Sequence, residues 1–432
     1  MTNFRTGNRA GATSKALTKE PDLFVLVIED QRSLSNLLKS LLSKRLNAEI
    51  HVAATYQEAR ELLKKNRTKY LVAICDIQLP DAPKGEIIDL VHRADLPIIG
   101  LSGKFTDDFF ESMLNKGIID YVHKDSLNAY SYVVDVVSNL YRNQKISVLV
   151  VDDSPSARAM IVHMLELQNF QVIQASDGEE ALNIINNNPK IKLLITDYQM
   201  PKLDGFQLTL KVREFVDKQQ LSIIGLSAKG GHELGPLFLK NGANDFLSKP
   251  FSYEELLCRI NHNIELLEHI EHIEKLANSD FLTKLSNRRF FFTECQKKLS
   301  NATKLQLGMA MVDIDFFKKI NDSYGHDCGD EVLIQFSNLL MKHFPTELVA
   351  RLGGEEFAIF FEDSTQKEIK KSVENFRTAL EALCPIWEDE KLIVTASIGL
   401  TYQYQASADA MLKIADENLY KAKNSGRNRV VD

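Results

Sequence analysis

Short runs of consecutive apolar residues alternate, along the first two-thirds of the chain, with segments whose apolar residues recur every three or four positions. The runs predict buried strands, and the spaced segments predict helices that pack one face on a core. Strands that alternate with helices in this way form parallel, doubly wound sheets. The first two-thirds of the chain is therefore predicted to be α/β.

The pattern occurs twice. "LFVLVIEDQRSLSNLLKSLL" (residues 23–42) matches "ISVLVVDDSPSARAMIVHML" (residues 146–165): each is an apolar strand, two acids, a polar turn and a helix. Three further pairs match in the same order: "YLVAICD" with "KLLITD", "PIIGLSGK" with "SIIGLSAK", and "GIIDYVHK" with "GANDFLSK". Similarity at this scale indicates two copies of one domain.

Polar residues stand where the strands of each copy end. They are Glu29, Asp30, Asp76, Ser102 and Lys124 in the first copy, and Asp152, Asp153, Asp197, Ser227 and Lys249 in the second. In a parallel sheet such positions converge at one edge. Three carboxylates suit one Mg²⁺ ion, and a lysine with a hydroxyl suits a phosphoryl group on the central aspartate. The alternative is a buried Lys–Asp pair that only stabilises the sheet.

Both copies resemble the response-regulator receiver domain in these residues. The resemblance implies a flavodoxin-like fold and a histidine kinase or phosphotransfer protein as phosphoryl donor. It also implies one Mg²⁺ per copy, bound by the two acids after the first strand and by the central aspartate. The implied roles are phosphoacceptor for Asp76 and Asp197, switch hydroxyl for Ser102 and Ser227, phosphate-binding lysine for Lys124 and Lys249, and switch aromatic for Tyr121 and Phe246.

The two copies are not identical. The first has Asp125 after its lysine where the second has Pro250, and it has one extra residue between Pro80 and Gly85. All its reactive positions are filled, so we expect it to be competent for phosphorylation.

A helix without proline or glycine is predicted from Tyr253 to Ala277. Its apolar residues recur three or four apart, as in an amphipathic or coiled-coil helix. We expect it to begin as the last helix of the second copy and to continue into a third domain, where it could carry a rotation. The alternative is an ordinary last helix followed by a passive spacer.

The last 150 residues have a different order. Ser279 or Asp280 can cap a helix, a buried strand ends at Asp313, and "RLGGEEFAIFF" and "VTASIGLTY" read as further strands. "ADENLYKAKNSGRNRVV" reads as a helix that ends in a basic loop. The strict βα spacing is lost, so an α/β layer with a mainly antiparallel sheet is predicted.

The third domain contains the residue types of a nucleotidyl-transfer site. Glycines at 353 and 354 permit close approach of a ligand, and Asp313, Glu355 and Glu356 can hold one or two divalent cations. The helix start after Asp315 offers backbone N–H groups to phosphate, and the final helix and loop add Lys423 and Arg427. Asn321 and Asp330 suit guanine: the amide can read N3 and N2, and the carboxylate can accept from N1–H and the exocyclic amine.

These motifs resemble the GGDEF family of diguanylate cyclases, here in a GGEEF form. The resemblance rests on "DFLTKLSNRR", "DIDFFKKIND", "YGHDCGDEVL", "GGEEF", "ASIG" and "AKNSGRN". It implies a nucleotidyl-cyclase-like fold and conversion of two GTP into cyclic di-GMP and two pyrophosphates. The implied Mg²⁺ ligands are Asp313, the Ile314 carbonyl, Glu355 and Glu356, with Glu355 assisting deprotonation of the ribose 3′-hydroxyl. The implied nucleotide-binding residues are Phe316, Phe317, Lys318, Asn321, Asp330, Gly353, Gly354, Lys423 and Arg427.

The resemblance has one gap. Many family members carry an Arg-x-x-Asp product-inhibition motif, and its two positions hold Phe344 and Glu347 here. Product feedback through that site is therefore predicted to be absent. Because the product joins two GTP molecules, we expect a homodimer through the receiver and cyclase domains. The rival interpretation is a non-catalytic scaffold that binds GTP or dimerises.

Composition limits the other classes. The 432-residue chain has a net charge of −7, a hydrophobic fraction of 44% and a charged fraction of 26%, as in an ordinary globular protein. An acidic balance argues against nucleic-acid or anionic-membrane partners, and no apolar run is long enough to span a bilayer. The five scattered cysteines suit a reducing compartment without structural zinc, so we expect a cytoplasmic protein.

The expected organisation has five parts. They are a disordered tail without a secretory signal (1–21), two receiver domains (22–143 and 144–262), a helical linker (263–278) and a cyclase domain (279–432).

Overall fold

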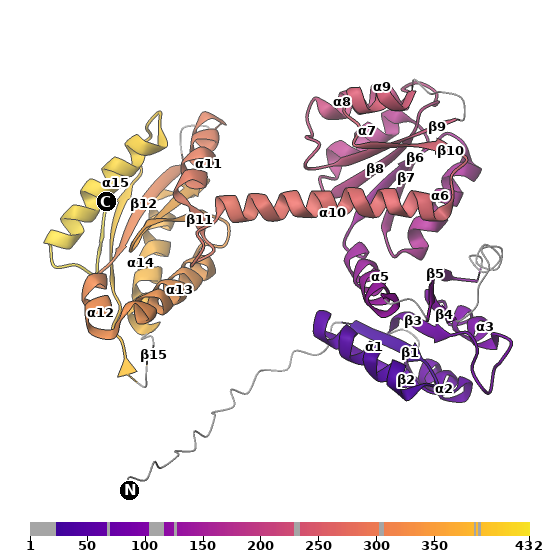
Figure 1. Cartoon of the computed structure of the whole chain (residues 1–432). Helices are drawn as coiled ribbons and strands as arrows, with labels where there is room; N and C mark the ends of the chain where they lie inside the picture. Colours follow the sequence, from indigo (N-terminus) through magenta and orange to yellow (C-terminus); the bar gives the residue numbers. More distant parts are fainter. Residues whose placement is uncertain are drawn as a thin grey trace, which may run out of the picture. The chain divides into compact units, whose positions relative to one another are not determined.

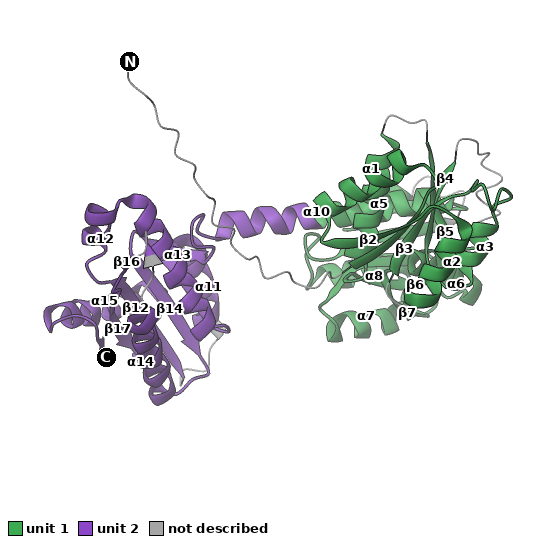
Figure 2. Cartoon of the chain, turned by 90° about the horizontal axis from the view of Figure 1, so that it is seen from below, with its two compact units in different colours: residues 1–267 green, residues 268–432 purple. Residues whose placement is uncertain are grey.

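The computed structural model describes residues 23–66, 70–102, 116–124, 128–228, 234–301, 306–383, 386–387 and 390–432. The chain divides into two compact units, residues 1–267 and 268–432 (Figure 2). None of the helices in these described ranges has the length and apolar character needed to cross a bilayer. The domain bounds expected from the sequence stay a prediction.

The first unit holds two five-stranded parallel sheets (Figure 1). The first sheet has the order β2-β1-β3-β4-β5, that of a flavodoxin-like fold. Its strands are β1 (Leu23–Ile28), β2 (Ala48–Ala53), β3 (Tyr70–Asp76), β4 (Ile98–Ser102) and β5 (Ile118–His123), and its helices are α1 (Arg32–Arg45), α2 (Tyr56–Asn66), α3 (Glu86–His92) and α5 (Ala129–Asn143).

Helices cover both faces of the first sheet because its strands are apolar on both sides. All seven residues of β3 are buried. One core packs Leu38 of α1 and Val133 of α5 against the sheet, and the other packs Leu63 of α2 and Val91 of α3 against the opposite face. Burial on both faces is the physical reason for the continuous apolar runs in the sequence.

The second sheet repeats this plan in the order β10-β9-β8-β6-β7. Its strands are β6 (Ser147–Val151), β7 (Gln171–Ala175), β8 (Ile191–Asp197), β9 (Ser222–Ala228) and β10 (Asp245–Lys249). Its helices are α6 (Pro155–Leu167), α7 (Gly178–Asn187), α8 (Gly205–Arg213), α9 (Leu234–Lys240) and the start of α10 (Tyr253–Asn278). The predicted pair of doubly wound parallel sheets is therefore confirmed.

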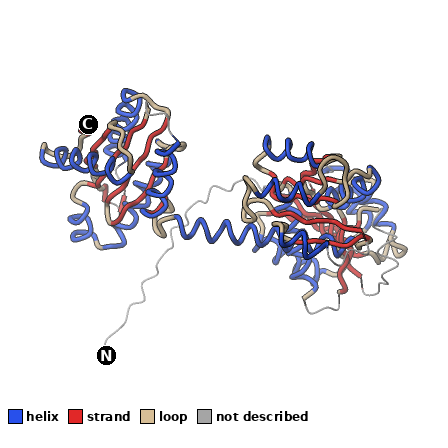
Figure 3. The backbone as a smooth tube through the Cα atoms, turned by 90° about the horizontal axis from the view of Figure 1, so that it is seen from above, coloured by secondary structure: helices blue, strands red, loops and turns tan. Residues whose placement is uncertain are grey.

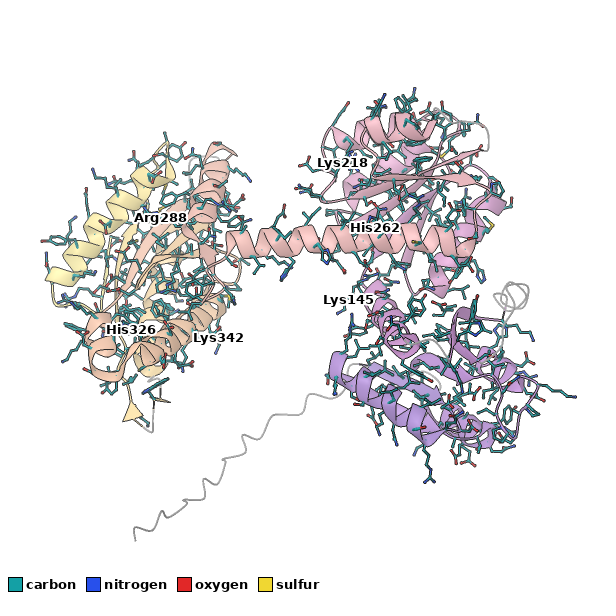
Figure 4. All side chains as sticks on the ribbon, in the orientation of Figure 1. Lys145, Lys218, His262, Arg288, His326 and Lys342 are labelled. Carbon is teal, nitrogen blue, oxygen red and sulfur yellow. The ribbon has the colours of Figure 1, made fainter. Side chains whose placement is uncertain are left out.

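The helix α10 is continuous over 26 residues, as its lack of proline and glycine predicts. Its first half buries apolar side chains at helical spacing, among them Leu256, Ile260 and Ile264, while His262 projects from the exposed side (Figure 4). In its second half Ile273 and Leu276 are exposed within the described structure. Thus α10 begins as the last helix of the second repeat and continues without a break into the second unit.

The second unit is built on a mixed six-stranded sheet of order β11-β13-β14-β12-β17-β18. The central pairs β13–β14, β14–β12 and β12–β17 are antiparallel, and the edge pairs are parallel, which confirms the expected α/β layer. The strands are β11 (Ser286–Asn287), β12 (Leu307–Ile314), β13 (Leu348–Gly353), β14 (Glu356–Glu362), β17 (Ala396–Thr401) and β18 (Val430–Val431), with a separate pair β15 (Ile386–Trp387) and β16 (Glu390–Lys391).

Helices also cover both faces of this sheet (Figure 3). One core contains residues of α13 (His326–His343) and α14 (Gln366–Leu383), and the other contains residues of α11 (Arg288–Asn301) and α15 (Ala408–Asn424). The short helix α12 (Phe317–Tyr324) follows β12.

The prediction that Ser279 or Asp280 caps the start of a helix is wrong. Ser279 forms an isolated bridge with Ser286, and α11 begins only at Arg288. The cap is Asn287, whose Oδ1 accepts from the Phe290 N–H at 3.0 Å. Asp280 instead closes a turn, because its Oδ1 accepts from both the N–H and the hydroxyl of Thr283.

Candidate functional site

In the first repeat, strand ends bring a lysine between two acids. Lys124 Nζ lies 2.7 Å from Asp76 Oδ2 and 2.8 Å from Glu29 Oε2. Both carboxylates are buried, and burial is the main reason why the pKa of Glu29 is raised. Burial alone would lower the pKa of Lys124, but its hydrogen bonds and charge interactions with Asp76 and Glu29 outweigh this effect and raise it. The lysine is therefore held as a cation beside Asp76.

The same corner fits a divalent cation. Ligand atoms of Glu29, Asp30 and Asp76 all lie within 4.8 Å of one another. They form the one group of three potential metal-binding side chains in the described part of the chain. Three carboxylates supply the hard oxygen donors that Mg²⁺ prefers, so the residues present fit the expected ion.

In the second repeat, Lys249 Nζ lies 2.6 Å from Asp197 Oδ1 and 2.8 Å from Asp152 Oδ2. Asp153 is exposed and lines an open cavity of about 550 Å³ together with Tyr198 and Met200. The three acids are brought to the same corner, although they are not gathered as tightly as those of the first repeat.

The predicted switch residues occupy equivalent places in the two repeats. Ser102 ends β4 and Ser227 lies near the end of β9, and both are buried. Tyr121 on β5 and Phe246 on β10 are half-buried. A Cβ atom at Gly235 would lie 2.3 Å from the Phe246 ring, so the ring rests directly on α9. Asp125 and residues 103–115 lie outside the described residues.

The acids of the second unit meet across two antiparallel strands. Asp313 near the end of β12 pairs directly with Glu356 at the start of β14. Burial raises the pKa of Asp313, the neighbouring carboxylates of Glu355 and Glu356 raise it further, and Lys423 opposes them. Since like charges repel, a cation here would relieve the three acids.

The glycine turn before these acids is open. Gly354 has φ +51°, a conformation that favours glycine, and a Cβ atom at either Gly353 or Gly354 would meet no described atom within 4 Å. Glu355 follows the turn, and its carbonyl accepts from the Ile314 N–H at 3.3 Å. The turn therefore leaves space for a ligand beside Asp313.

Basic and aromatic groups line the start of α12. Phe316 precedes the helix in the left-handed conformation (φ +59°), and Phe317 and Lys318 form its first turn. Lys423 Nζ lies 2.8 Å from Asp313 Oδ2, and the Arg427 guanidinium lies over the Phe316 ring, 4.7 Å from its centre. The predicted phosphate-binding residues thus surround one helix N-terminus.

The predicted base-reading pair lies on adjacent helices, Asn321 on α12 and Asp330 on α13. Asn321 Oδ1 is buried and accepts no hydrogen bond from any described group, whereas Asp330 is exposed. The backbone of Gly329 presses so closely on this amide that a Cβ atom there would lie 1.9 Å from Oδ1. A buried acceptor without a donor is costly, and the N–H groups of a purine would satisfy it.

Two contacts of the site were not expected from the sequence. Arg351 donates from Nε to the Gly354 carbonyl at 2.9 Å and from Nη1 to Asp280 Oδ1 at 3.1 Å, so Asp280 braces the glycine turn. Asp315, two residues after Asp313, is buried among hydroxyl donors. The "DFLTKLSNRR" and "DIDFF" motifs contain both acids, but nothing in their spacing names their partners.

At the two product-inhibition positions, Phe344 is buried in the core and Glu347 is half-buried, with a pKa raised by burial.

Comparison with known proteins agrees with this geometry. The model for the response regulator receiver domain matches residues 25–129 and 148–261, and the model for the GGDEF domain of diguanylate cyclases matches residues 277–429. The chain is similar to the response regulator PleD of Caulobacter vibrioides, with 33% identity over 298 residues, 66% of this chain. The matched region spans 65% of that relative's length, somewhat less than two-thirds.

Two further likenesses cover parts of the chain. Diguanylate cyclase A of Treponema denticola is 34% identical over 177 residues, 39% of this chain and 46% of the relative. A crystal structure of a two-component system response regulator/GGDEF domain protein is 40% identical with a TM-score of 0.54, and the match covers 57% of this chain and 100% of that one.

Proposed function

The chain belongs to the response-regulator family, with two receiver domains and a C-terminal GGDEF domain, and from this premise we propose that it is a phosphorylation-regulated diguanylate cyclase. The reaction joins two GTP molecules into cyclic di-GMP and releases two pyrophosphates. The observation that carries the proposal is the pairing of Asp313 with Glu356 across β12 and β14, beside the open glycine turn and the basic end of α15.

Each GTP is bound at its two ends. The buried Asn321 Oδ1 accepts from the guanine 2-amino group, and Asp330 accepts from N1–H and the same amine. At the other end the backbone of Phe317 and Lys318 and the cations Lys423 and Arg427 hold the triphosphate. Fixing both ends orients the ribose and the α-phosphate for reaction.

Two phosphodiester bonds form in the overall reaction. The 3′-oxygen of one GTP attacks the α-phosphorus of the other, the bond from that phosphorus to the bridging oxygen breaks, and pyrophosphate leaves. Glu355 accepts the proton of the 3′-hydroxyl. Asp313, the Ile314 carbonyl, Glu355 and Glu356 would hold Mg²⁺, which when bound offsets the charge that develops on the phosphate oxygens. One site holds one GTP, so two copies of the chain must meet, and a homodimer is part of the proposal.

Control is assigned to the receivers. A histidine kinase or phosphotransfer protein phosphorylates Asp197, and also Asp76, beside the lysine that already contacts each of them. Glu29, Asp30 and Asp76, and the equivalent acids of the second receiver, would hold Mg²⁺, which when bound would offset the charge of the phosphoryl group. The added charge repacks the receivers and stabilises the productive dimer.

The test measures cyclic di-GMP formed from GTP by the purified full-length chain, with and without beryllofluoride as phosphoryl mimic. Beryllofluoride should raise the rate, and the Asp76→Asn and Asp197→Asn variants should show which receiver is responsible. Equal rates in both states would refute the control by phosphorylation.

Glu355→Gln separates an enzyme from a scaffold that only binds GTP or dimerises. It removes a proton acceptor and a negative charge at nearly constant size. Turnover should be lost while GTP binding and dimerisation persist. A variant with unchanged turnover would exclude Glu355 from the reaction.

A further inference from the structure

Asp315 is a buried acid with its hydrogen-bonding capacity engaged within the protein. Its Oδ1 accepts from Ser397 Oγ at 2.7 Å, and its Oδ2 accepts from Thr395 Oγ1 at 2.8 Å and from the Asn428 N–H at 3.0 Å. Its side chain has no exposed surface, and the Arg427 Nε lies 4.0 Å from its Oδ1. A carboxylate held by three donors is stable when buried, but it is poorly placed to bind a metal ion.

One of those donors comes from a strained loop. Residues 425–429 connect α15 to β18, and Gly426, Arg427 and Asn428 all have positive φ values, of +108°, +60° and +44°. For side chains other than glycine this conformation costs on the order of 1 kcal/mol or more, and it persists only where neighbouring contacts enforce it. The Asn428 N–H to Asp315 bond is such a contact, and it joins the loop to the end of β12.

The loop carries the cation expected at the phosphates. The Arg427 guanidinium is stacked over the exposed Phe316 ring, and its Nε faces Asp315 Oδ1 at 4.0 Å. Phe316 itself follows Asp315 directly and is also left-handed. Asp315 is therefore connected to both partners of the stack. Phe316 is its neighbour in the chain, and Arg427 is the neighbour of Asn428, whose N–H donates to Asp315.

We propose that Asp315 is a positioning residue, which fixes Arg427 over Phe316 at the phosphate end of the nucleotide site. This inference rests on the proposed function, because it takes the ligand to be a guanine nucleotide with phosphates near α12. Asp315 touches no substrate atom. Its effect is to hold the guanidinium in place before the nucleotide arrives, so that less freedom is lost on binding.

The consequence is selective for the triphosphate. Arg427 is assigned to the phosphates, whereas Asn321 and Asp330 are assigned to the base. Loosening the loop should therefore weaken the binding of GTP, which carries three phosphates, much more than the binding of GMP, which carries one. In Asp315→Asn the negative charge is lost and one of the two acceptor oxygens becomes an NH₂ group, so the Asn428 N–H no longer has a charged acceptor. The variant should bind 3′-deoxy-GTP about tenfold more weakly, the scale of one lost charge-assisted hydrogen bond. Binding of GMP should stay within about twofold of wild type, below the effect of a net hydrogen bond.

The experiment is calorimetric titration of the full-length protein with 3′-deoxy-GTP and with GMP. The analogue lacks the attacking hydroxyl, so binding is measured without turnover. Asp409→Asn is the matched control, because it makes the same charge change at an exposed position in the first turn of α15. It should leave both affinities unchanged. Wild-type protein that binds neither nucleotide would refute the proposed function itself. The ratio of the 3′-deoxy-GTP affinity to the GMP affinity in Asp315→Asn, compared with that in wild type, tests only the role of Asp315.

A double-mutant cycle tests the route of the effect. If Asp315 acts through Arg427, the variant Asp315→Asn with Arg427→Ala should bind 3′-deoxy-GTP no more weakly than Arg427→Ala alone. Additive losses, or equal losses for 3′-deoxy-GTP and GMP, would overturn the proposal.

A milder variant covers the case in which Asp315→Asn does not fold. Thr395→Val keeps the carboxylate and removes one donor that orients it. It should weaken 3′-deoxy-GTP in the same selective way, to a smaller extent. An unchanged ratio of the two affinities in Thr395→Val would count against the positioning role.

Discussion

Replacing Gly329 by alanine should damage base recognition without damaging the fold. Gly329 lies in α13, and its added Cβ atom would fall 1.9 Å from Asn321 Oδ1 and 3.2 Å from Phe317 Cζ. Contacts under 3.0 Å cannot persist, so the Asn321 side chain must turn away. The backbone of Gly329 is not in the left-handed region, so alanine adds no conformational strain there.

Two effects of opposite sign follow, and their sizes can be compared. Gly329 is the fourth residue of α13, where alanine is more favourable than glycine by up to about 1 kcal/mol, which would stabilise the fold. Displacing Asn321 would remove one or two of the hydrogen bonds proposed to guanine, each worth about 0.5–1.5 kcal/mol. The free energy of unfolding should therefore be unchanged or higher, while KM for GTP rises by roughly tenfold.

The assay is initial-rate pyrophosphate release with GTP and with ITP, which lacks the 2-amino group. Wild type should prefer GTP, because ITP has no 2-amino group to donate to the buried Asn321 Oδ1, and leaving this acceptor without a donor is costly. In Gly329→Ala this preference should fall towards one. Thermal unfolding of each variant shows whether the fold is intact.

Asn321→Ala is the matched control, because it removes the side chain that the new methyl group would displace. In that background Gly329→Ala should change KM no further. An intact Gly329→Ala protein with wild-type KM and wild-type GTP preference would refute the assignment of Asn321 to the base.

Two other outcomes follow from single residues of the second unit. The hydrogen bonds from Thr283 and Arg351 outweigh burial and lower the pKa of Asp280, so its stabilising effect is present above its unfolded pKa and is lost as pH falls through the lower folded value. Asp280→Asn should thus reduce the free energy of unfolding by about 1 kcal/mol at pH 7 and by less below about pH 4. Unfolding of the second unit can be followed by the fluorescence of the single tryptophan, Trp387. Added cyclic di-GMP should not slow the initial rate through the site of the feedback motif, because Phe344 is buried in the core where that motif has arginine. Inhibition that persists in Glu347→Ala would place a product site elsewhere, and inhibition that this variant abolishes would contradict the prediction.

The sequence was sufficient to predict the contacts that follow from the direction of parallel strands. Parallel strands end at one edge, so Lys124 could be expected beside Asp76 and Lys249 beside Asp197, and both contacts are present. The two parallel sheets and the continuous helix α10 followed from apolar spacing and from the absence of proline and glycine. These features depend on local pattern and on chain direction, which the sequence states directly.

Helix capping after α10 was predicted wrongly for a local reason. Ser279, Asp280 and Asn287 are all residue types that cap helices, and the sequence cannot rank them. Asp280 accepts hydrogen bonds from Thr283 and from Arg351, which follows it by 71 positions. The helix therefore begins later, after the cap Asn287. A contact with a distant strand decided between equivalent local candidates.

The two acids that follow β12 show the same limit in chemical terms. Asp313 and Asp315 are identical side chains two residues apart, and both are buried. Asp313 faces Glu356 and Lys423, so it keeps an unneutralised cluster of charge that a cation can join. Asp315 meets Thr395, Ser397 and the Asn428 N–H, which satisfy it completely. Those donors arrive from β17, from Thr395 directly before it and from the loop after α15, at least 80 positions along the chain. Strand pairing rather than residue type therefore leaves charge unneutralised at one acid and satisfies the other.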